Sequence, residues 1–221
     1  HNFELTNTDS QFLSNAPTTQ YARLTDYGTL PFLNFVPSSS DDVDWITIKY
    51  YKADGTTAAG SDAILNQTSN GGAASIGNAD TRLNYFGAFP ANLDGWSSNF
   101  AVAVANDLAY YTVQAQTASL SQIYTINIIC PNERGYEGIR LAWLNQWGTW
   151  DYYTFNMKST RSVTTNRTSY TQLGGTWNES TFKISDYKGG KKNFRVNSTE
   201  KIRLNTDFVT EAEGVWFEEL I

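Results

Sequence analysis

The sequence predicts an all-β protein, for three reasons. Aromatic residues make up 14% of the 221 residues, hydrophobic residues 40%, and charged residues only 17%. Aromatic residues and Thr favour pleated strands, whereas the Glu, Lys, Leu and Ala mixture typical of helices is thin. Short apolar runs recur between turn signals, as in sandwiches and barrels. We expect two β-sandwich-like units, Ig-like or jelly-roll-like, at residues 1–121 and 122–221, with a short C-terminal helix in the second.

The first half predicts short strands of different clarity. Residues 43–51 alternate, with Ile46, Ile48 and Tyr50 on one face, so a strand is expected there, closed by a turn at Ala53-Asp-Gly55. Before Pro37 the chain carries turn signals among short apolar pieces. Residues 90–95 are expected to form a turn. Further strands are expected at residues 83–89, 100–104, 108–116 and 123–129.

The most aromatic stretch, residues 139–157, predicts a β-hairpin. Two apolar runs flank a short turn around Gly148, which can adopt positive φ without a Cβ clash. Apolar side chains fall on both faces of both runs. A hairpin of this kind is more often central in a sheet or at an interface than half-solvated. We expect it to join the two halves of the chain.

Beyond the hairpin, one polar strand is expected at residues 159–170 and a set of short strands at 181–184, 193–197 and 201–204. The last segment, residues 210–221, predicts a helix, because Thr210 can cap its first N–H groups while Glu213 reaches back to the cap. Its apolar stripe includes Trp216, Phe217 and Leu220. So short a helix is marginal alone in water, so it must pack on a sheet or a partner.

Charge is unevenly spread along the chain. The formal net charge is −6, yet ten of the sixteen Lys and Arg residues lie between Lys158 and Arg203. Such asymmetry indicates either electrostatically complementary partners or two solvated faces of opposite sign, and the sequence leaves both open. Phe182, Tyr187 and Phe194 lie among the basic residues, as single-strand nucleic-acid binding requires. The acidic total charge argues against a nucleic-acid partner and favours a partner protein.

The inventory of chemical groups is poor for catalysis, and we expect no enzyme, no cofactor and no metal. The chain has one histidine, His1, and one cysteine, Cys130, which excludes an internal disulfide and His/Cys metal sites. Asp41, Asp42 and Asp44 lack the spacing of a calcium loop. The Gly-Gly pair within residues 69–73 lacks the Lys-Ser/Thr of a phosphate loop.

The start and the end of the chain are informative. It begins with His1 rather than Met and ends at Ile221 inside an apolar run. We expect both ends to be cuts in a longer polypeptide or products of processing. No run approaches the roughly 18 apolar residues of a membrane helix, so no membrane partner is expected.

Sugar chemistry is the main alternative. Trp143, Trp147 and Trp150 can stack on sugars, so a glycan-binding adhesin that recognises a host surface glycan is the second hypothesis. Aromatics that alternate along strands are more often core or interface. A glycosidase needs two carboxylates at a fixed separation. The carboxylates near the hairpin are Glu133, Glu137 and Asp151.

Two C-terminal stretches resemble virion structural proteins of tailed bacteriophages. Arg140-Leu-Ala-Trp-Leu-Asn-Gln-Trp-Gly-Thr-Trp-Asp-Tyr-Tyr-Thr-Phe155 is similar to their R-x-x-W/F-L-N-x-x-G-x-W/F-D-x-Y-T-F stretch. Thr199 to Glu213, followed by Trp216-Phe-Glu-Glu-Leu-Ile221, is similar to their K-I-x-L-N-S-D-W-L-T-E-E-E…W-L-x-E-L ending. Residues 86–93 are a weaker echo. The chain departs from the pattern at Gly214, where a helix-favouring residue is expected.

The resemblance implies a non-enzymatic component of the virion, in the tail, neck or baseplate, that contacts other copies of itself or neighbouring virion proteins. It implies no catalytic residues. At the hairpin, Trp143, Trp150 and Phe155 are expected to be scaffold and Trp147 to be free to meet a partner. The candidate assembly residues are Trp147, Trp150, Tyr152, Trp216, Phe217 and Leu220.

Overall fold

The computed structural model is an all-β protein in which helices are few and short. It describes residues 12–33, 43, 45–65, 83–116, 120–129, 135–172, 174–176, 180–183 and 190–220. The chain divides into two compact units. We call residues 1–157 with 206–221 the core unit, and residues 158–205 the ribbon unit.

The boundaries of these units differ from the predicted domain boundary between residues 121 and 122. That expected boundary falls between β6 (Tyr110–Gln116) and β7 (Tyr124–Ile128), which are antiparallel neighbours in one sheet. The ribbon unit is instead an insertion, because the chain returns to the core unit after it. Because one sheet continues across the predicted boundary, the residues before and after it share a core and do not form two separate domains.

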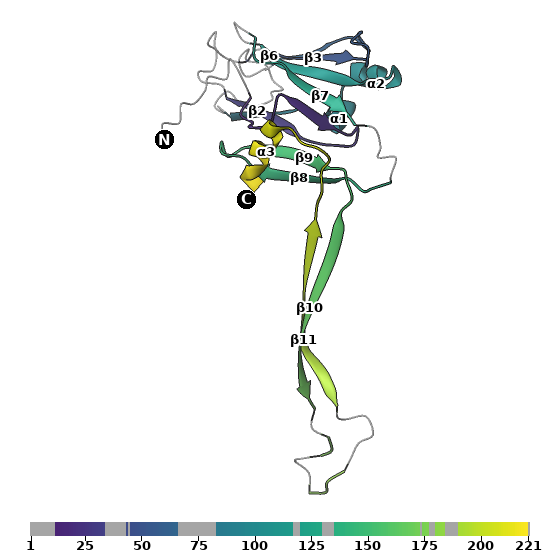
Figure 1. Cartoon of the computed structure of the whole chain (residues 1–221), viewed down its shortest axis with the longest axis vertical. Helices are drawn as coiled ribbons and strands as arrows, with labels where there is room; N and C mark the ends of the chain where they lie inside the picture. Colours follow the sequence, from purple (N-terminus) through teal and green to yellow (C-terminus); the bar gives the residue numbers. More distant parts are fainter. Residues whose placement is uncertain are drawn as a thin grey trace. The chain divides into compact units, whose positions relative to one another are not determined.

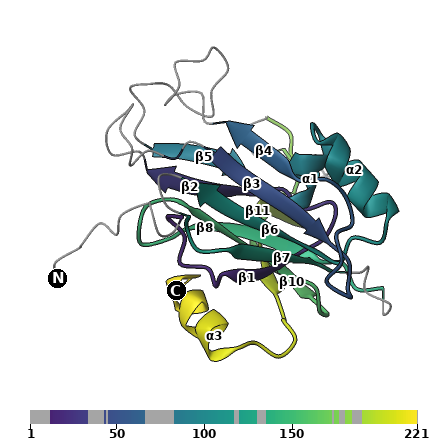
Figure 2. The same cartoon turned by 90° about the horizontal axis from the view of Figure 1, so that it is seen from above.

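The largest sheet of the core unit has five strands (Figures 1 and 2). β1 and β7 are parallel, while the other neighbouring pairs are antiparallel. A parallel pair needs a long connection, and most of the core unit lies between these two strands in the chain. The strand order is β1 (Thr19–Ala22), β7, β6, β3 (Trp45–Tyr51) and β4 (Asp62–Leu65).

The predicted strand at residues 43–51 is confirmed as β3. Ile46, Ile48 and Tyr50 are fully buried, while Trp45 and Lys49 are exposed, so one face of the strand packs inward. The predicted strands at 83–89, 108–116 and 123–129 are likewise confirmed, as β5 (Leu83–Gly87), β6 and β7.

The expected strand at residues 100–104 is wrong. Ser98–Ala105 forms the helix α2, which lies against β3. The Ser97 hydroxyl accepts a hydrogen bond from the Phe100 N–H at 2.9 Å, which is an N-cap. Phe100 and Ala103 are buried, three positions apart on one helix face. The expected turn at 90–95 is the short helix α1 (Pro90–Asp94), with proline at its first position.

The main core of the core unit draws on the large sheet, on a second pair of strands and on both of these helices. β2 (Thr29–Leu33) and β5 pair antiparallel and contribute Leu30, Phe32 and Phe86. Burial of an aliphatic or aromatic side chain contributes about 1.5–3 kcal/mol. The largest buried side chains here are Phe12, Leu30, Phe32, Ile46, Ile48, Tyr50, Phe89, Leu93, Phe100, Tyr111, Tyr124 and Ile126.

The predicted hairpin is confirmed as β8 (Ile139–Leu144) and β9 (Trp150–Phe155), with Gly148 at φ +74° in its turn. The predicted C-terminal helix is confirmed as α3 (Glu211–Phe217), which continues as the 3₁₀ turn η1 (Glu218–Leu220). Its capping box is formed: Glu213 Oε2 accepts from the Thr210 N–H at 2.8 Å, and Thr210 Oγ1 accepts from the Glu213 N–H at 3.2 Å.

The ribbon unit is a single long hairpin. β10 (Thr160–Thr171) confirms the predicted polar strand, and β11 (Lys191–Arg203) pairs with it antiparallel. The expected short strands at 193–197 and 201–204 are therefore one continuous strand, and residues 181–183 are not in a strand. The register shifts by one residue between Thr168 and Ser169, which is a β-bulge.

Candidate assembly surfaces

One face of the β8–β9 hairpin packs on α3. The paired residues Leu141 and Tyr153 lie on this face, beside Trp143. Trp143 is only 8% exposed, and its ring centroid lies 4.9 Å from that of Trp216. Tyr153 contacts Phe217 edge to face at 4.7 Å. Aromatic pairs of this geometry contribute about 0.5–1.5 kcal/mol beyond burial, so the hairpin and helix hold each other.

A buried carboxylate ties this contact to the N-terminal segment. Asp151 is 2% exposed and accepts a hydrogen bond from the Trp216 indole N–H at 2.8 Å. It also accepts from the Ser14 hydroxyl at 2.7 Å, from the Asn15 N–H at 3.3 Å and from the Asn145 amide at 3.2 Å. These four donors come from three places in the chain, namely α3, the N-terminal segment and the hairpin turn, so Asp151 acts as a structural hub.

The other face of the hairpin packs on the main core. The Tyr152 ring lies 5.9 Å from that of Phe89. The Arg140 guanidinium lies over both rings, 4.6 Å from the Phe89 centroid and 5.3 Å from the Tyr152 centroid. Of the two expected settings, the hairpin has the interface, between α3 and the main core, and it is not central in a larger sheet, because β8 and β9 form a two-stranded sheet of their own. Because Tyr152 packs on this core, it is a poor candidate for contact with a partner.

Arg140 also leads to a buried ionic network that the sequence did not predict. The Asp26 carboxylate lies 3.4 Å from Arg140 Nη1 and 3.0 Å from Arg23 Nη2, and it accepts from the Thr154 hydroxyl at 2.8 Å. Burial pushes the pKa of Asp26 up, but the Arg23 N–H, the Thr154 hydroxyl and the Arg140 charge outweigh it and hold the pKa below its ordinary value. Asp26 and Arg140 are 114 residues apart in the chain, so no local spacing signals their contact.

The three tryptophans proposed as a sugar platform do not share a surface. Trp143 pairs with Asp151 and lies on the α3 side, whereas Trp150 pairs with Leu144 on the opposite side of the hairpin. Trp143 is buried, and Trp150 is 44% exposed. Successive residues of a strand point to opposite faces. Trp150 is next to Asp151, the cross-strand partner of Trp143, so Trp143 and Trp150 lie on opposite faces of the hairpin.

The expectation that Trp147 is the free aromatic is also corrected. Trp147 is half-buried, and its indole N–H donates to Asn15 Oδ1 at 2.7 Å. Asn145 Oδ1 accepts from the N–H groups of Trp147 and Thr149, so the turn is held by its own side chain. Trp150 and Leu144, which are cross-strand partners, are the exposed apolar residues beside this turn.

The remaining assembly candidates differ in exposure. Trp216 is buried against Trp143 and is not available to a partner. Phe217 is half-buried, and Leu220 is exposed. Burial raises the pKa of the neighbouring Glu219, while a hydrogen bond from the Asn15 amide opposes that shift. The outer face of the C-terminal helix is therefore more accessible than its tryptophan.

Of the three carboxylates considered for glycoside hydrolysis, the structure describes Glu137 and Asp151, which differ in exposure. Asp151 is buried among four donors and Glu137 is exposed on the segment before β8, while Glu133 lies outside the described residues. Asp41, Asp42, Asp44 and Cys130 lie outside them as well. Within the described part of the chain there is no group of three or more His, Cys, Asp or Glu arranged to hold a metal ion.

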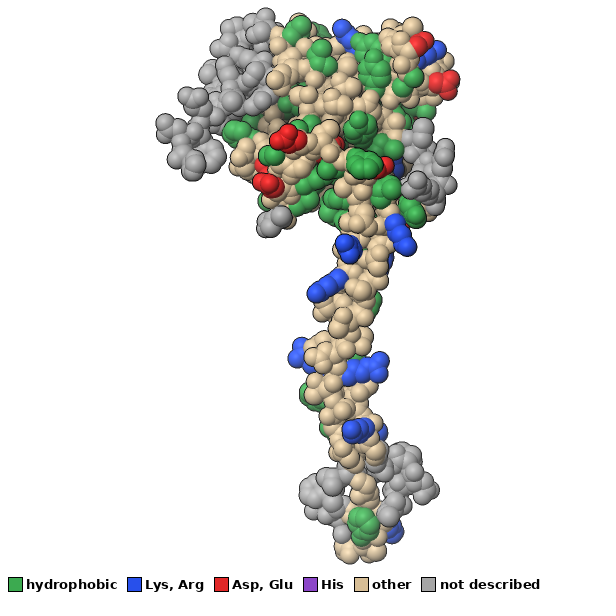
Figure 3. Space-filling view, in the orientation of Figure 1, with side chains coloured by type: hydrophobic (Ala, Val, Ile, Leu, Met, Phe, Trp, Pro, Cys, Tyr) green, Lys and Arg blue, Asp and Glu red, His purple; other side chains and the backbone are tan. Residues whose placement is uncertain are grey.

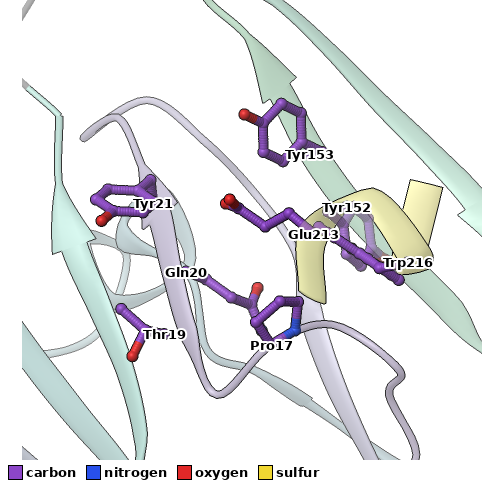
Figure 4. A pocket seen from close by; sticks show the side chains of 8 residues that line it. All are labelled: Pro17, Thr19, Gln20, Tyr21, Tyr152, Tyr153, Glu213 and Trp216. Atoms are coloured by element: carbon purple, nitrogen blue, oxygen red, sulfur yellow. The ribbon is translucent and has the colours of Figure 1, made fainter. Parts of the chain in front are cut away.

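Two hollows border α3. The smaller, of about 10 Å³, lies among β1, β9 and α3 and includes Gln20, Glu213 and Trp216 (Figure 4). It has room for about one water molecule. The larger, of about 230 Å³, lies beside residues 206–210 and includes Tyr21, Tyr153 and Phe208.

Among the described helices, none is long and apolar enough to cross a membrane.

The described residues of the ribbon unit include no buried core. Every residue of β10 and β11 is exposed. Lys and Arg side chains follow both strands (Figure 3). The sequence carried a signal for this arrangement, because long runs of Thr, Ser and Asn without regular aliphatic alternation indicate strands that face solvent on both sides.

Comparisons of the chain with protein-family models, with curated proteins and with solved structures find no match.

Proposed function

We propose that this chain is a non-enzymatic structural protein of a tailed-bacteriophage virion, which forms repeated subunit contacts in the tail, neck or baseplate. The single observation that carries the proposal is the ribbon unit, with strands of 12 and 13 residues whose every residue is exposed. A two-stranded hairpin is at best marginally stable alone in water. Such an element is stabilised by contact with another surface, which an assembly supplies.

Two further features support the proposal. Residues 140–155 and 199–221 resemble segments of virion structural proteins. The aromatic residues nearest the hairpin turn and the C-terminal helix are largely engaged in holding the core unit together, which is a structural role. For the fold we propose a sandwich-like core unit of the Ig-like or jelly-roll-like kind, because the large sheet and the β2–β5 pair contribute to one core.

Sedimentation velocity and electron microscopy of the purified chain test the proposal. The expected result is a concentration-dependent series of assemblies with a regular repeat. Immunogold labelling of phage particles that carry the gene should place the chain in the virion. A monomer at all concentrations that is also absent from the particle overturns the proposal.

A glycan-binding adhesin is the second candidate, and exposed Trp150 favours it. One exposed tryptophan beside an exposed leucine can stack on a sugar ring. Glycan-array binding that is lost in Trp150→Ala but kept in the matched variant Trp96→Ala, another exposed tryptophan, supports this candidate. Equal binding by both variants contradicts it.

A further inference from the structure

The register of the ribbon unit places different side chains on its two faces. Cross-strand partners lie on one face and alternate along each strand. One face carries four cations, namely Lys192, Arg195, Lys201 and Arg203. The other face, which we call the aliphatic face, carries Val163, Val196 and Ile202, together with Arg161, Arg167, Lys191 and Glu200. The Arg195 guanidinium bonds Asn197 Oδ1 at 3.0 Å, which agrees with these two residues sharing a face.

The aliphatic face is uncovered. Val163, Val196 and Ile202 are 63%, 52% and 45% exposed. Docking on another surface would remove their exposed apolar area from water, which is energetically favourable. This face carries three aliphatic side chains on two strands, with three cations and one carboxylate among them, so its chemistry matches a partner that is both apolar and acidic.

Charge identifies the partner as a second copy of this chain. The ribbon unit holds ten Lys or Arg against three Asp or Glu, a formal charge of +7. The core unit holds the remaining six Lys or Arg against nineteen Asp or Glu, a formal charge of −13. A nucleic acid would meet the acidic core unit with repulsion, whereas another copy offers an acidic surface.

The core unit has a strip of the required chemistry along the outer side of α3. Glu211, Val215 and Glu218 follow one another at helical spacing on one face, and all three are exposed. The preceding segment adds Asp207 and the exposed Phe208 and Val209. We call these exposed residues of α3 and of the segment before it, together with the start of η1, the acidic strip: Asp207, Phe208, Val209, Glu211, Val215 and Glu218.

Resting on the assembly function proposed above, we propose that the aliphatic face of one copy's ribbon docks on the acidic strip of a second copy. Valine and isoleucine meet Phe208, Val209 and Val215, while Arg161 and Arg167 approach the carboxylates. Because the two surfaces differ, the contact is head to tail, and it produces a ring or a filament.

The size of the ribbon sets the strength of one contact. Twelve residues at about 3.3 Å each give a length of about 40 Å, and two strands give a width of about 10 Å. One face thus covers at most on the order of 400 Å², about half of what one partner contributes to a standard stable interface of about 800 Å². A single contact is therefore weak, and repetition stabilises the assembly.

The test uses matched charge changes on the full chain. Val196→Glu places a carboxylate in the aliphatic face, and Asn197→Glu makes the same charge change one residue on, on the opposite face. On the strip, Val215→Glu is matched by Ala212→Glu, which is exposed but lies off the Glu211–Val215–Glu218 row. We expect the first variant of each pair to lower the association constant by tenfold or more and its control by less than about threefold. Ile202→Glu, at the other end of the aliphatic face, should repeat the Val196→Glu result.

Mixing the two defective variants separates this contact from any other. Val196→Glu keeps an intact strip and Val215→Glu keeps an intact ribbon, so their mixture should form a complex of two copies that grows no further. Near-UV circular dichroism of each variant should match the parent, which excludes loss of the core unit.

Two results overturn the inference. Assemblies that persist in Val196→Glu and Ile202→Glu exclude the ribbon as the contact and leave the proposed structural function standing. Binding of a single-stranded oligonucleotide at about 150 mM salt, weakened equally by Val196→Glu and Asn197→Glu, assigns the ribbon to nucleic acid instead. Failure of the parent chain to assemble under any condition counts against the structural function itself.

Discussion

The Trp216 indole on α3 donates a hydrogen bond to the Asp151 carboxylate on β9, with 2.8 Å between Nε1 and Oδ2. Both side chains are buried, and the whole ribbon unit lies between them in the chain. The contact therefore closes the core unit around the point where the chain leaves and returns. The rings of Trp143 and Tyr153 pack against the Trp216 ring and add apolar contacts to this hydrogen bond.

Removal of the Asp151 carboxylate should be strongly destabilising. Asp151→Ala leaves the Trp216 indole, the Ser14 hydroxyl and two further donors without their acceptor, and one unsatisfied buried group costs about 1–3 kcal/mol. We expect the free energy of unfolding to fall by about 3 kcal/mol or more, measured by urea denaturation followed by tryptophan fluorescence. The exposed Asp94→Ala should change it by less than about 0.5 kcal/mol. Equal effects of the two substitutions contradict the hub role of Asp151.

Acid should weaken the core unit through Asp26. Its pKa in the folded protein lies below the ordinary value, so its stabilising contribution is complete above the unfolded pKa of about 3.9 and is lost as pH falls through the folded value. Melting temperatures measured from pH 7 down to pH 3 should therefore decline. In Asp26→Asn the melting temperature should start lower at pH 7 and decline less over the same range. A decline as steep as that of the parent removes Asp26 as the cause.

Two glycines should respond in opposite directions to the same substitution. Gly214 lies inside α3, where an added Cβ meets nothing within 4 Å, so Gly214→Ala should raise the free energy of unfolding by about 1 kcal/mol. Gly148 also has open space, but its φ is +74°, so Gly148→Ala should lower it by about 1–2 kcal/mol. Urea midpoints of the two variants, compared with the parent, give the signs. Shifts of the same sign would falsify this account of backbone strain.

The ribbon unit should be removable. The Asn205 side-chain amide donates to the Lys158 carbonyl oxygen at 2.6 Å, so the two ends of the insertion are adjacent. We expect the chain with residues 160–203 replaced by a short Gly-Ser linker to fold, because both main clusters of buried side chains lie in the core unit. Its near-UV circular dichroism should match that of the parent, and its thermal unfolding should stay cooperative. Loss of cooperative unfolding contradicts an independent core unit.

The local sequence pattern predicts many of the strands and the C-terminal helix, but it does not predict which elements pack against one another. Alternation at Ile46, Ile48 and Tyr50 predicted a strand, and Thr210 with Glu213 predicted a helix start. Both signals are complete within a few residues. Nothing local states that Trp143 meets Trp216, because periodicity identifies an apolar face without identifying what covers it.

The errors have physical causes too. The run from Phe100 to Ala105 alternates valine with alanine, which suits a strand as well as a helix; the Ser97 cap and the burial of Phe100 decided for the helix. The glycosidase alternative includes Asp151 because this residue lies beside tryptophans in the sequence. Its position on an apolar strand, between aromatic residues, is the signal of a buried acceptor.

Because the ribbon unit is an insertion, its length can change without a change in the core unit. Adding one residue to each strand lengthens the ribbon by about 3.3 Å and leaves the buried clusters of the core unit untouched. Because side chains alternate, an addition of two residues to each strand keeps every outer side chain on its face, while an addition of one reverses those beyond it. The bulge opposite Thr168 and Ser169 differs from such an addition, because it adds one residue, Phe194, to β11 alone. Ribbon length can therefore change in discrete steps without any change in the buried clusters of the core unit.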